Sequence, residues 1–268
     1  MALTTLLTLT LACPSAPSAP GITRAVWPAS TPVKTATSVG TVPPTLCANQ
    51  RGSSTALSLG PTDRLHAAGI DVSHFNGPVP WLTLSQAGLT YAFAKATEGL
   101  DYTDPRFADN WAAMKACGIP RGAYHFLVPK DDPAAQAEHF LSVLGEDLGE
   151  LPLVVDVERG FSGAVHPCSA LQSTLRVFLQ TLEAKTQHAV MIYTGPGFWK
   201  THMCDDKSFS SRPLWVARYS KTEPELFGGW KRWDFWQYSQ RGQVGGSRAD
   251  LDRFRSDVRA LQAWRRGP

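Results

Sequence analysis

From about residue 67 onward, short apolar runs alternate with longer stretches in which apolar residues recur about every three to four positions. Short apolar runs bounded by turn residues predict strands, and the longer periodic stretches predict helices. Aspartate followed by proline begins two of these helices and a glycine ends each of them, as is typical of helix termini. We expect strands at 68–71, 90–96, 121–127, 151–156 and 189–194, and helices at 81–87, 104–118, 132–145 and 169–186.

The last third of the chain has a different pattern, because the helical periodicity weakens after residue 194. Strands are expected at 213–219, 233–239 and 251–254, followed by an amphipathic helix at 255–264. Five strand–helix units followed by three strands with few helices predict an α/β fold, an irregular TIM-like barrel. A doubly wound open sheet is the alternative, but no Gly-x-Gly-x-x-Gly motif follows a strand.

The N-terminal segment has the composition of a targeting sequence. Residues 2–12 form an apolar, threonine-rich stretch that is followed by small residues and prolines. We therefore predict a signal peptide over residues 1–17, which is too short to span a membrane. No lysine or arginine precedes the apolar stretch, which departs from the usual pattern, and a buried first helix is the alternative. Thr-Leu-Ala-Cys13 resembles a lipoprotein box weakly, so lipid anchoring through Cys13 is a less favoured alternative.

A linker is expected between this segment and the folded domain. Residues 18–66 are rich in proline, serine and threonine and have no sustained period. Such a composition predicts a poorly ordered tether, which leaves residues 67–268 as the folded domain. A signal peptide followed by a tether predicts a secreted protein, located in the periplasm or outside the cell.

Charge and cysteine content exclude some classes of partner. The 268 residues contain 26 lysines and arginines against 23 aspartates and glutamates. These basic residues are scattered, so no nucleic-acid partner is expected. We also expect the protein to be a monomer. The five cysteines form neither a Cys-x-x-Cys pair nor a Cys/His cluster, so no metal or other cofactor is predicted. Because export permits disulfides, Cys168 and Cys204 are the first choice of pair, and Cys117 is either a buried free thiol or the partner of Cys47.

Two carboxylates follow the predicted buried strand that ends near residue 156. Asp156 and Glu158 are separated by Val157, and alternate residues of a strand point to the same face with Cα atoms roughly 6–7 Å apart. An acidic pair on the surface is the alternative interpretation. Burying two carboxylates in a core is costly, so we expect them to line a pocket.

Polar side chains also stand at the ends of the other strands, which in a barrel of this type meet at one rim. Acidic, amide and phenolic groups beside tryptophans are typical of a carbohydrate site, although a single tryptophan in the late strands is more often part of the core. Lys95 and Arg218 can instead pair with carboxylates, and His125 fits a structural role better than a catalytic one. The rim residues are Asp71, Lys95, Glu98, Tyr124, His125, Asp156, Glu158, Tyr193, Arg218, Gln237, Tyr238 and Asp250, with Trp215, Trp230, Trp233 and Trp236 beside them.

These segments together resemble the glycoside hydrolase family 25 lysozymes, the Chalaropsis-type N-acetylmuramidases. The resemblance covers about residues 67–263, and its motifs are weak singly but strong in this order. They are Gly69-Ile-Asp-Val-Ser-His, Lys95-Ala-Thr-Glu-Gly, Asp104-Pro-Arg-Phe with Asn110-Trp111, Gly122-Ala-Tyr-His-Phe, Asp132-Pro-Ala-Ala-Gln-Ala, Asp156-Val-Glu158, Ile192-Tyr-Thr, Leu214-Trp-Val-Ala, Trp236-Gln-Tyr and Asp250-Leu-Asp-Arg-Phe.

The resemblance implies an eight-stranded barrel that hydrolyses the β-1,4 bond between N-acetylmuramic acid and N-acetylglucosamine in peptidoglycan glycan strands. It implies Glu158 as the general acid and Asp156 as its partner carboxylate, and Asp71 is expected as a further catalytic acid. Asp250 is the least regular match, because the family often has Gly-x-Val-Asp where this chain has Gly246-Ser-Arg-Ala-Asp250. The expected substrate-binding residues are Tyr124, Glu98, Tyr193, Trp215, Gln237, Tyr238 and Asp250.

A glycosidic oxygen leaves poorly unless it is protonated, so Glu158 must hold a proton near neutral pH. A like charge at Asp156 would raise the pKa of Glu158. Asp156 is then expected to orient the acetamido group of the substrate, whose carbonyl attacks the anomeric carbon. A water molecule activated by Asp156 or Asp71, with inversion, is the rival mechanism. A non-catalytic wall-binding domain and another amidosugar hydrolase, such as a chitinase, are the alternative functions.

Overall fold

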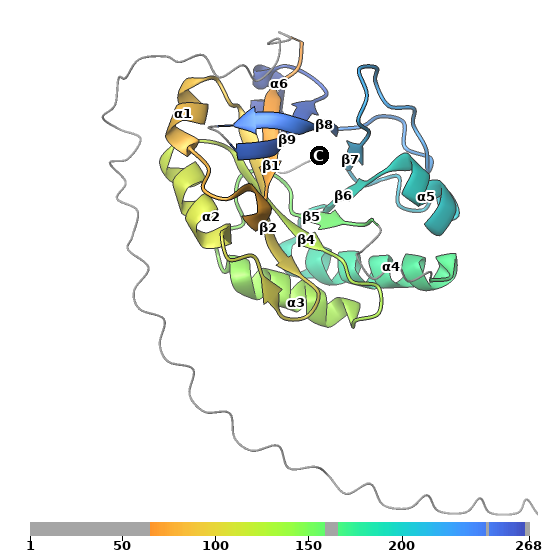
Figure 1. The fold of residues 1–268 in the computed structure, drawn as a ribbon. Helices are drawn as coiled ribbons and strands as arrows, with labels where there is room; N and C mark the ends of the chain where they lie inside the picture. The colour runs from red at the N-terminus through yellow and green to blue at the C-terminus, as the bar shows by residue number, and fades with distance from the viewer. Residues whose placement is uncertain (1–64, 159–165, 245–246, 266–268) are drawn as a thin grey trace, which may run out of the picture. The chain divides into compact units, whose positions relative to one another are not determined.

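The computed structural model describes residues 65–158, 166–244 and 247–265. In these residues a ring of strands closes into a barrel with helices on its outside (Figure 1). The order is β1-β9-β8-β7-β6-β5-β4-β2, and pairing between β1 and β2 completes the ring. The strands are β1 (Ala68–Val72), β2 (Tyr91–Glu98), β4 (Arg121–Phe126), β5 (Val154–Asp156), β6 (Met191–Thr194), β7 (Leu214–Ala217), β8 (Phe235–Val244) and β9 (Ser247–Phe254), while the short β3 (Tyr102–Thr103) pairs with β2 outside the ring.

The irregular TIM-like barrel predicted from the sequence is confirmed, and the direction of β9 is an added detail. The other strands of the ring run parallel to their neighbours, whereas β9 is antiparallel to both β8 and β1. Because β8 ends at Val244 and β9 begins at Ser247, the connection is too short for the crossover that parallel strands require. The eighth position of the ring is therefore filled by the second strand of a hairpin.

The helices largely follow the predicted positions. α3 begins as expected, because Asp132 accepts a hydrogen bond from the backbone nitrogen of Ala135 and a proline fills the first turn. α2 begins later than expected and has no side-chain cap. Asp104 lies before its start, where Oδ2 accepts from the backbone and ring nitrogens of His74 and Oδ1 accepts from the backbone nitrogen of Arg106. The helices are α1 (Trp81–Gln86), α2 (Phe107–Ala116), α3 (Pro133–Leu144), α4 (Cys168–Thr186), α5 (Pro196–His202) and α6 (Val258–Trp264), with the 3-10 turn η2 (His74–Asn76).

Aromatic side chains fill the interior of the barrel. Phe93 from β2 stacks on Trp215 from β7 with ring centroids 4.4 Å apart, and Phe235 from β8 packs edge-on against Phe93 at 5.1 Å. Gly69 belongs to this packing because a Cβ atom there would lie 2.2 Å from the ring of Tyr91. The interior is thus a packed core, and space for a ligand remains only toward the ends of the strands.

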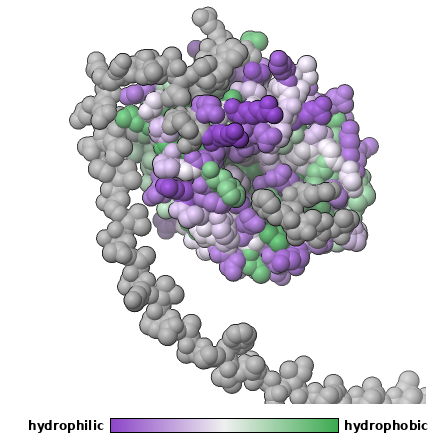
Figure 2. Space-filling model, viewed as in Figure 1, coloured by the Kyte–Doolittle hydropathy of each residue, from purple (hydrophilic) through white to green (hydrophobic). Residues whose placement is uncertain are grey.

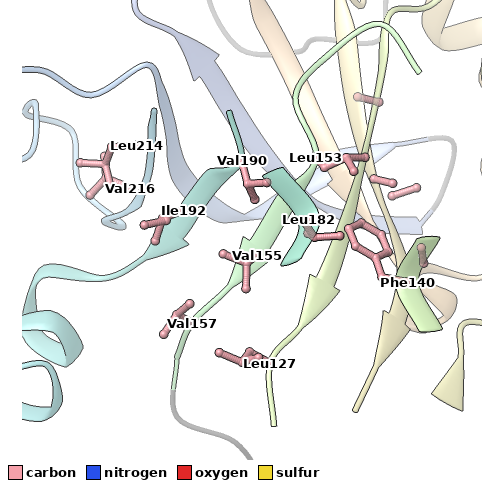
Figure 3. Packing of buried hydrophobic residues seen from close by; sticks show 14 of the residues in the cluster. Leu127, Phe140, Leu153, Val155, Val157, Leu182, Val190, Ile192, Leu214 and Val216 are labelled. Atoms are coloured by element: carbon pink, nitrogen blue, oxygen red, sulfur yellow. The ribbon is translucent and has the colours of Figure 1, made fainter. Parts of the chain in front are cut away.

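A second core fills the layer between the barrel and its helices. Figure 3 shows Val155 of β5 and Ile192 of β6 pointing away from the barrel axis, with Leu182 of α4 and Phe140 of α3 beside the strands. These side chains are almost fully buried. Residues along a strand face its two sides in turn. Val155 of β5 and Val157, just after the strand, therefore lie in this layer, and Asp156 faces the barrel interior.

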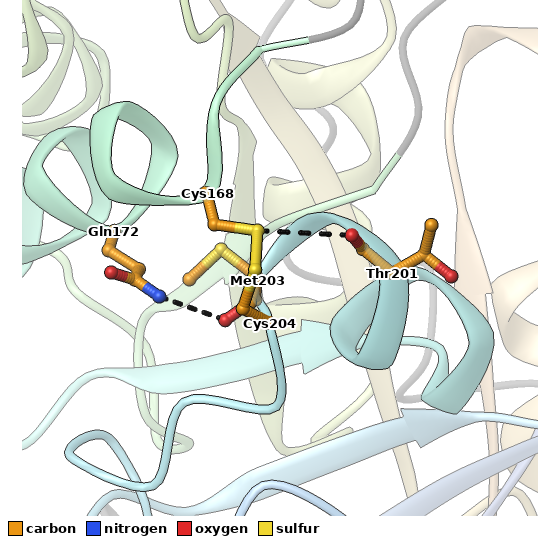
Figure 4. Close-up of a disulfide and its surroundings, with 5 residues drawn as sticks. All are labelled: Cys168, Gln172, Thr201, Met203 and Cys204. Carbon is orange, nitrogen blue, oxygen red and sulfur yellow. Dashed lines mark hydrogen bonds between the residues drawn. A yellow bond between two sulfur atoms is a disulfide. The ribbon is translucent and has the colours of Figure 1, made fainter.

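One disulfide confirms the predicted pairing of Cys168 with Cys204, which joins the first residue of α4 to the segment after α5 (Figure 4). The amide nitrogen of Gln172 donates to the carbonyl of Met203 at 3.0 Å, which ties the same two segments together. Cys117 is also disulfide-bonded, so it is not the free thiol that was one of its two alternatives. Cys47, its predicted partner, lies outside the described residues.

The predicted signal peptide over residues 1–17 and nearly all of the predicted tether lie outside the described residues, so both stay predictions. Within the described ranges, none of the helices has the length and apolar character needed to cross a bilayer. On the face seen in Figure 2, hydrophilic residues prevail and hydrophobic ones are scattered in small groups, as is usual for a protein surface in water.

Candidate active site

A pocket opens at the carboxyl ends of the barrel strands, with about 420 Å³ of space that includes its open mouth. Each strand of the ring except β2 contributes a lining side chain, either from within the strand or from the segment that follows it. All predicted site residues except Glu98 and Tyr238 line this pocket. The lining residues are Asp71, Tyr124, Asp156, Glu158, Tyr193, Trp215, Tyr219, Gln237 and Asp250.

Strand register explains why residues far apart in sequence meet here. Asp156 of β5 lies opposite Tyr193 of β6, and Tyr193 lies opposite Trp215 of β7. On the other side of the ring, Asp71 of β1 lies opposite Asp250 of β9. Successive residues of a strand point to opposite faces of the sheet, and each of these residues occupies a position that faces the barrel interior.

Asp156 and Glu158 form the acidic pair at the end of β5. Asp156 is only 6% exposed, and its Oδ1 has no hydrogen-bond partner among the described residues. Burial raises the pKa of Asp156 well above its usual range, and the neighbouring charge of Glu158 raises it further. Because Asp156 also lines the pocket, its carboxyl group is placed to form a hydrogen bond with a ligand there.

The pKa of Glu158 is raised as well. Burial is the main cause, the ammonium group of Lys95 acts in the opposite direction, and the charge of Asp250 adds to the rise. Asp156 and Glu158 also repel each other when both are charged. The repulsion between these two carboxyl groups is the effect that the sequence predicted for the pair.

Gln237 connects the remaining polar groups of the pocket through its side-chain amide. Its nitrogen donates to Oδ2 of Asp71 at 2.7 Å and to Oδ2 of Asp250 at 3.3 Å. Its oxygen accepts from the hydroxyl groups of Tyr193 at 2.9 Å and Tyr219 at 3.1 Å. The amide is therefore fully occupied by protein partners, and Gln237 orders the carboxylates rather than offering free atoms to a ligand.

Asp71 and Asp250 face each other across β1 and β9. Burial, followed by the charge of Asp250, raises the pKa of Asp71 to about 8, and burial raises the pKa of Asp250 to about 6. Asp252, two residues along β9, is 1% exposed and forms a hydrogen bond with Asp71. Asp252 belongs to the Asp250-Leu-Asp-Arg-Phe motif but was not among the predicted site residues. Its spacing of two from Asp250 could have indicated that both side chains face the same side of the strand.

The raised pKa of Asp71 predicts how stability depends on pH. A carboxyl group whose pKa is near 3.8 in the unfolded chain and about 8 in the folded protein stabilises the fold fully below pH 4. That contribution is lost as the pH rises toward 8. We expect the free energy of unfolding, measured by urea titration, to fall more steeply from pH 4 to pH 8 in the wild type than in Asp71→Asn, by on the order of a few kcal/mol. Parallel curves for the two proteins would contradict the assigned pKa shift.

Two predicted site residues lie away from the pocket. Glu98, at the end of β2, accepts from the ammonium group of Lys95 at 2.6 Å and is one-third exposed. Tyr238 follows Gln237 on β8 and so points to the opposite face, where its ring packs on Trp236 and under the guanidinium of Arg253. Any substrate contact of these two residues would have to be made outside the described pocket.

Several residues of the predicted rim have the structural roles that were the alternatives to a role in the site. His125 is fully buried on the outer side of β4, between Oγ1 of Thr97 at 2.8 Å and the Gln136 carbonyl oxygen at 3.1 Å. Burial lowers its pKa to about 3, which suits a neutral structural histidine. Lys95 pairs with Glu98, as that alternative predicted. The late tryptophans other than Trp215 belong to the outer core: Trp230, Trp233 and Trp236.

Tyr219 was not predicted as a site residue. It follows β7, and its side chain reaches back to the Gln237 amide, although the residue is 52% exposed. It lies beyond the end of the regular strand, where the alternation of faces no longer predicts direction. Among the described residues, no group of three or more histidine, cysteine or acidic side chains is placed to hold a metal ion.

A closed α/β barrel with paired carboxyl groups at its strand ends, set in a pocket with aromatic walls, has the architecture of a glycoside hydrolase. The sequence model described as glycosyl hydrolases family 25 matches residues 70–247. The chain belongs to this family, as the sequence analysis predicted, and it is a glycoside hydrolase.

Named relatives agree with this membership. The chain is 38% identical over 206 residues to lysozyme M1 of Streptomyces globisporus, which covers 73% of this chain and 69% of the relative. It is 32% identical to the N,O-diacetylmuramidase of Chalaropsis sp. over 67% of this chain and 90% of the relative. The crystal structure of a bacterial lysozyme from Streptomyces coelicolor superposes with a TM-score of 0.68 at 34% identity, covering 74% of this chain and 95% of that one.

Proposed function

We propose that this chain is a secreted lysozyme that hydrolyses the β-1,4 bond between N-acetylmuramic acid and N-acetylglucosamine in peptidoglycan. Family membership and the relatives named lysozyme and N,O-diacetylmuramidase support this class of substrate. The proposal for the site is carried by one observation, the buried Asp156 and the partly buried Glu158 that line the pocket at the end of β5. Secretion is supported by the predicted signal peptide alone.

Glu158 is the general acid of the proposed reaction. Burial raises its pKa, so a larger fraction of Glu158 holds its proton near neutral pH than would in water. In the first step it transfers this proton to the glycosidic oxygen as the bond from the anomeric carbon to that oxygen breaks. In the second step the resulting carboxylate takes a proton from the attacking water, as microscopic reversibility requires.

Asp156 orients the acetamido group of the substrate, which acts as the nucleophile. Its carboxyl group, in the wall of the pocket, accepts a hydrogen bond from the acetamido N–H of the muramic acid residue. This bond lowers the pKa of Asp156 from its raised value, because donors favour the charged form. The acetamido carbonyl oxygen then attacks the anomeric carbon and forms a cyclic oxazolinium ion, whose positive charge the Asp156 carboxylate stabilises. Water opens the ring from the opposite face, with overall retention.

Other residues of the pocket support a saccharide substrate. Tyr193 and Trp215 provide aromatic surface beside the carboxyl groups, with ring centroids 4.7 Å apart. Tyr219, which also lines the pocket, is 52% exposed. Aromatic rings that stay exposed near a polar pocket offer flat apolar faces on which pyranose rings pack.

Digestion of purified peptidoglycan, with analysis of the new reducing ends, tests this proposal. We expect soluble fragments that carry N-acetylmuramic acid at their reducing ends, because the bond broken is the one on the anomeric carbon of that sugar. New ends made only of N-acetylglucosamine would refute the muramidase assignment. Binding to the wall without any new reducing ends would favour the non-catalytic wall-binding alternative.

A further inference from the structure

Asp252 lies directly beneath the pocket and does not line it. It occupies an inward position on β9, opposite Gly69 of β1, and is only 1% exposed. Its side chain forms a hydrogen bond with that of Asp71, which does line the pocket. Asp252 is therefore linked to the pocket through Asp71, which lines it.

The two oxygens of Asp252 have different surroundings. Oδ1 accepts a hydrogen bond from the indole nitrogen of Trp215 at 2.9 Å. Oδ2 finds no donor among the described residues, and the carboxyl group beside this side chain belongs to Asp71. Two carboxylate oxygens cannot hydrogen-bond unless one of them carries a proton.

The charges and polar groups around Asp252 favour a neutral side chain. Asp71 from β1 and Asp250 from its own strand are both acidic, and the phenol of Tyr91 from β2 also lies close enough to sense its charge. The phenol of Tyr238 from β8 senses its charge too, and none of the largest effects on the pKa of Asp252 comes from a cation. An ionised carboxylate that is buried without a cation is very costly, and protonation removes that cost.

We propose that Asp252 is a permanently neutral acid that donates its carboxyl hydrogen to Asp71 and so acts as a positioning residue for the catalytic pocket. Asp71 then accepts two hydrogen bonds, one from Asp252 and one from the Gln237 amide at 2.7 Å. These donors come from β9 and β8 and fix the plane of the Asp71 carboxylate relative to the pocket. The catalytic consequence of this inference rests on the proposed function.

Two substitutions separate a neutral donor from a charged group. In Asp252→Asn the amide oxygen can accept from Trp215 and the amide nitrogen can donate to Asp71, which are the two bonds that a neutral acid makes. Asp252→Leu has a similar volume and makes neither bond. We expect Asp252→Asn to keep kcat on peptidoglycan within about threefold of the wild type, and Asp252→Leu to lose about ten- to a hundredfold, the worth of a hydrogen bond to a charged group.

The pH profile distinguishes positioning from a purely structural role. Loss of the donor removes a bond that favours ionised Asp71, so the acidic limb of the kcat profile should move to higher pH in Asp252→Leu. The limb should stay in place in Asp252→Asn. Loss of activity or a shifted limb in a folded Asp252→Asn protein would overturn the proposal, because it would mean that the charge of Asp252 is needed.

Infrared spectroscopy gives a readout that does not depend on activity. The difference spectrum of wild type minus Asp252→Asn, with isotope-labelled aspartate at neutral pH, should contain the C=O band of a protonated carboxylic acid. Carboxylate bands alone would overturn the proposal. If the wild type fails to cleave peptidoglycan, the proposed function is refuted, and this spectrum still decides whether Asp252 is neutral.

Discussion

Replacing Glu158 with glutamine is expected to lower kcat on peptidoglycan by about 10²- to 10⁴-fold, the usual contribution of a general acid. Glutamine has nearly the same shape but no proton to give to the glycosidic oxygen, so the leaving group must depart as an alkoxide. Substrate binding, measured with insoluble peptidoglycan, should change little, because Glu158 acts on the bond that breaks. Urea unfolding should show a fold at least as stable as the wild type, because a partly buried group that can ionise has been replaced by a neutral amide of similar shape.

A matched substitution controls for the chemical change itself. Glu138→Gln makes the same replacement on the exposed surface of α3, where Glu138 pairs with Lys185, and it should leave kcat unchanged. A substrate whose leaving group needs no proton, such as an activated aryl glycoside, should restore much of the rate of the first, bond-breaking step in Glu158→Gln. Retained activity of Glu158→Gln on peptidoglycan would remove Glu158 as the acid.

Asp156→Asn is the second change with a large expected effect. Asparagine still accepts a hydrogen bond from the acetamido group, but it has no negative charge to stabilise the oxazolinium ion as it forms. We expect kcat to fall by about 10²- to 10³-fold, as is typical when one preorganised electrostatic group is lost from an active site. KM should change far less, because the hydrogen bond in the ground state is kept.

The dependence of the rate on the leaving group of the substrate distinguishes the role of Asp156 from that of Glu158. An activated aryl glycoside should not rescue Asp156→Asn, because the missing charge acts on the ring that forms and not on the group that leaves. Asp109→Asn, on the exposed surface of α2, serves as the matched control and should keep full activity. Equal rescue of Asp156→Asn and Glu158→Gln would contradict the separate roles proposed for the two carboxyl groups.

The sequence predicted those parts of the site that depend on strand periodicity. Asp71, Tyr124 and Asp156 stand at the ends of regular strands, so the alternation of faces and the order of strands were enough to place them together. The same rule should have excluded Tyr238, because it directly follows the inward-facing Gln237 on β8. Its assignment to substrate binding came from the motif as a whole and not from the face on which it lies.

Features that depend on tertiary contacts could not be predicted in this way. The role of Gln237 follows from hydrogen bonds to Asp71, 166 positions away, and to Tyr193, 44 positions away. Asp104 was predicted to cap α2, but its carboxylate accepts from the side chain of His74 and from the backbone nitrogen of Arg106, which precedes the helix. The short helix α5 has no side-chain cap and only seven residues, so its sequence carries little periodic signal.

One NMR measurement tests most directly whether Asp156 and Glu158 cleave the proposed bond by the proposed route. The wild-type protein would cleave a purified oligosaccharide of alternating N-acetylglucosamine and N-acetylmuramic acid, and proton spectra would be recorded before the products mutarotate. The account predicts that the first new reducing end is N-acetylmuramic acid in the β configuration. An α-configured first product, or a new reducing end on N-acetylglucosamine, would contradict it.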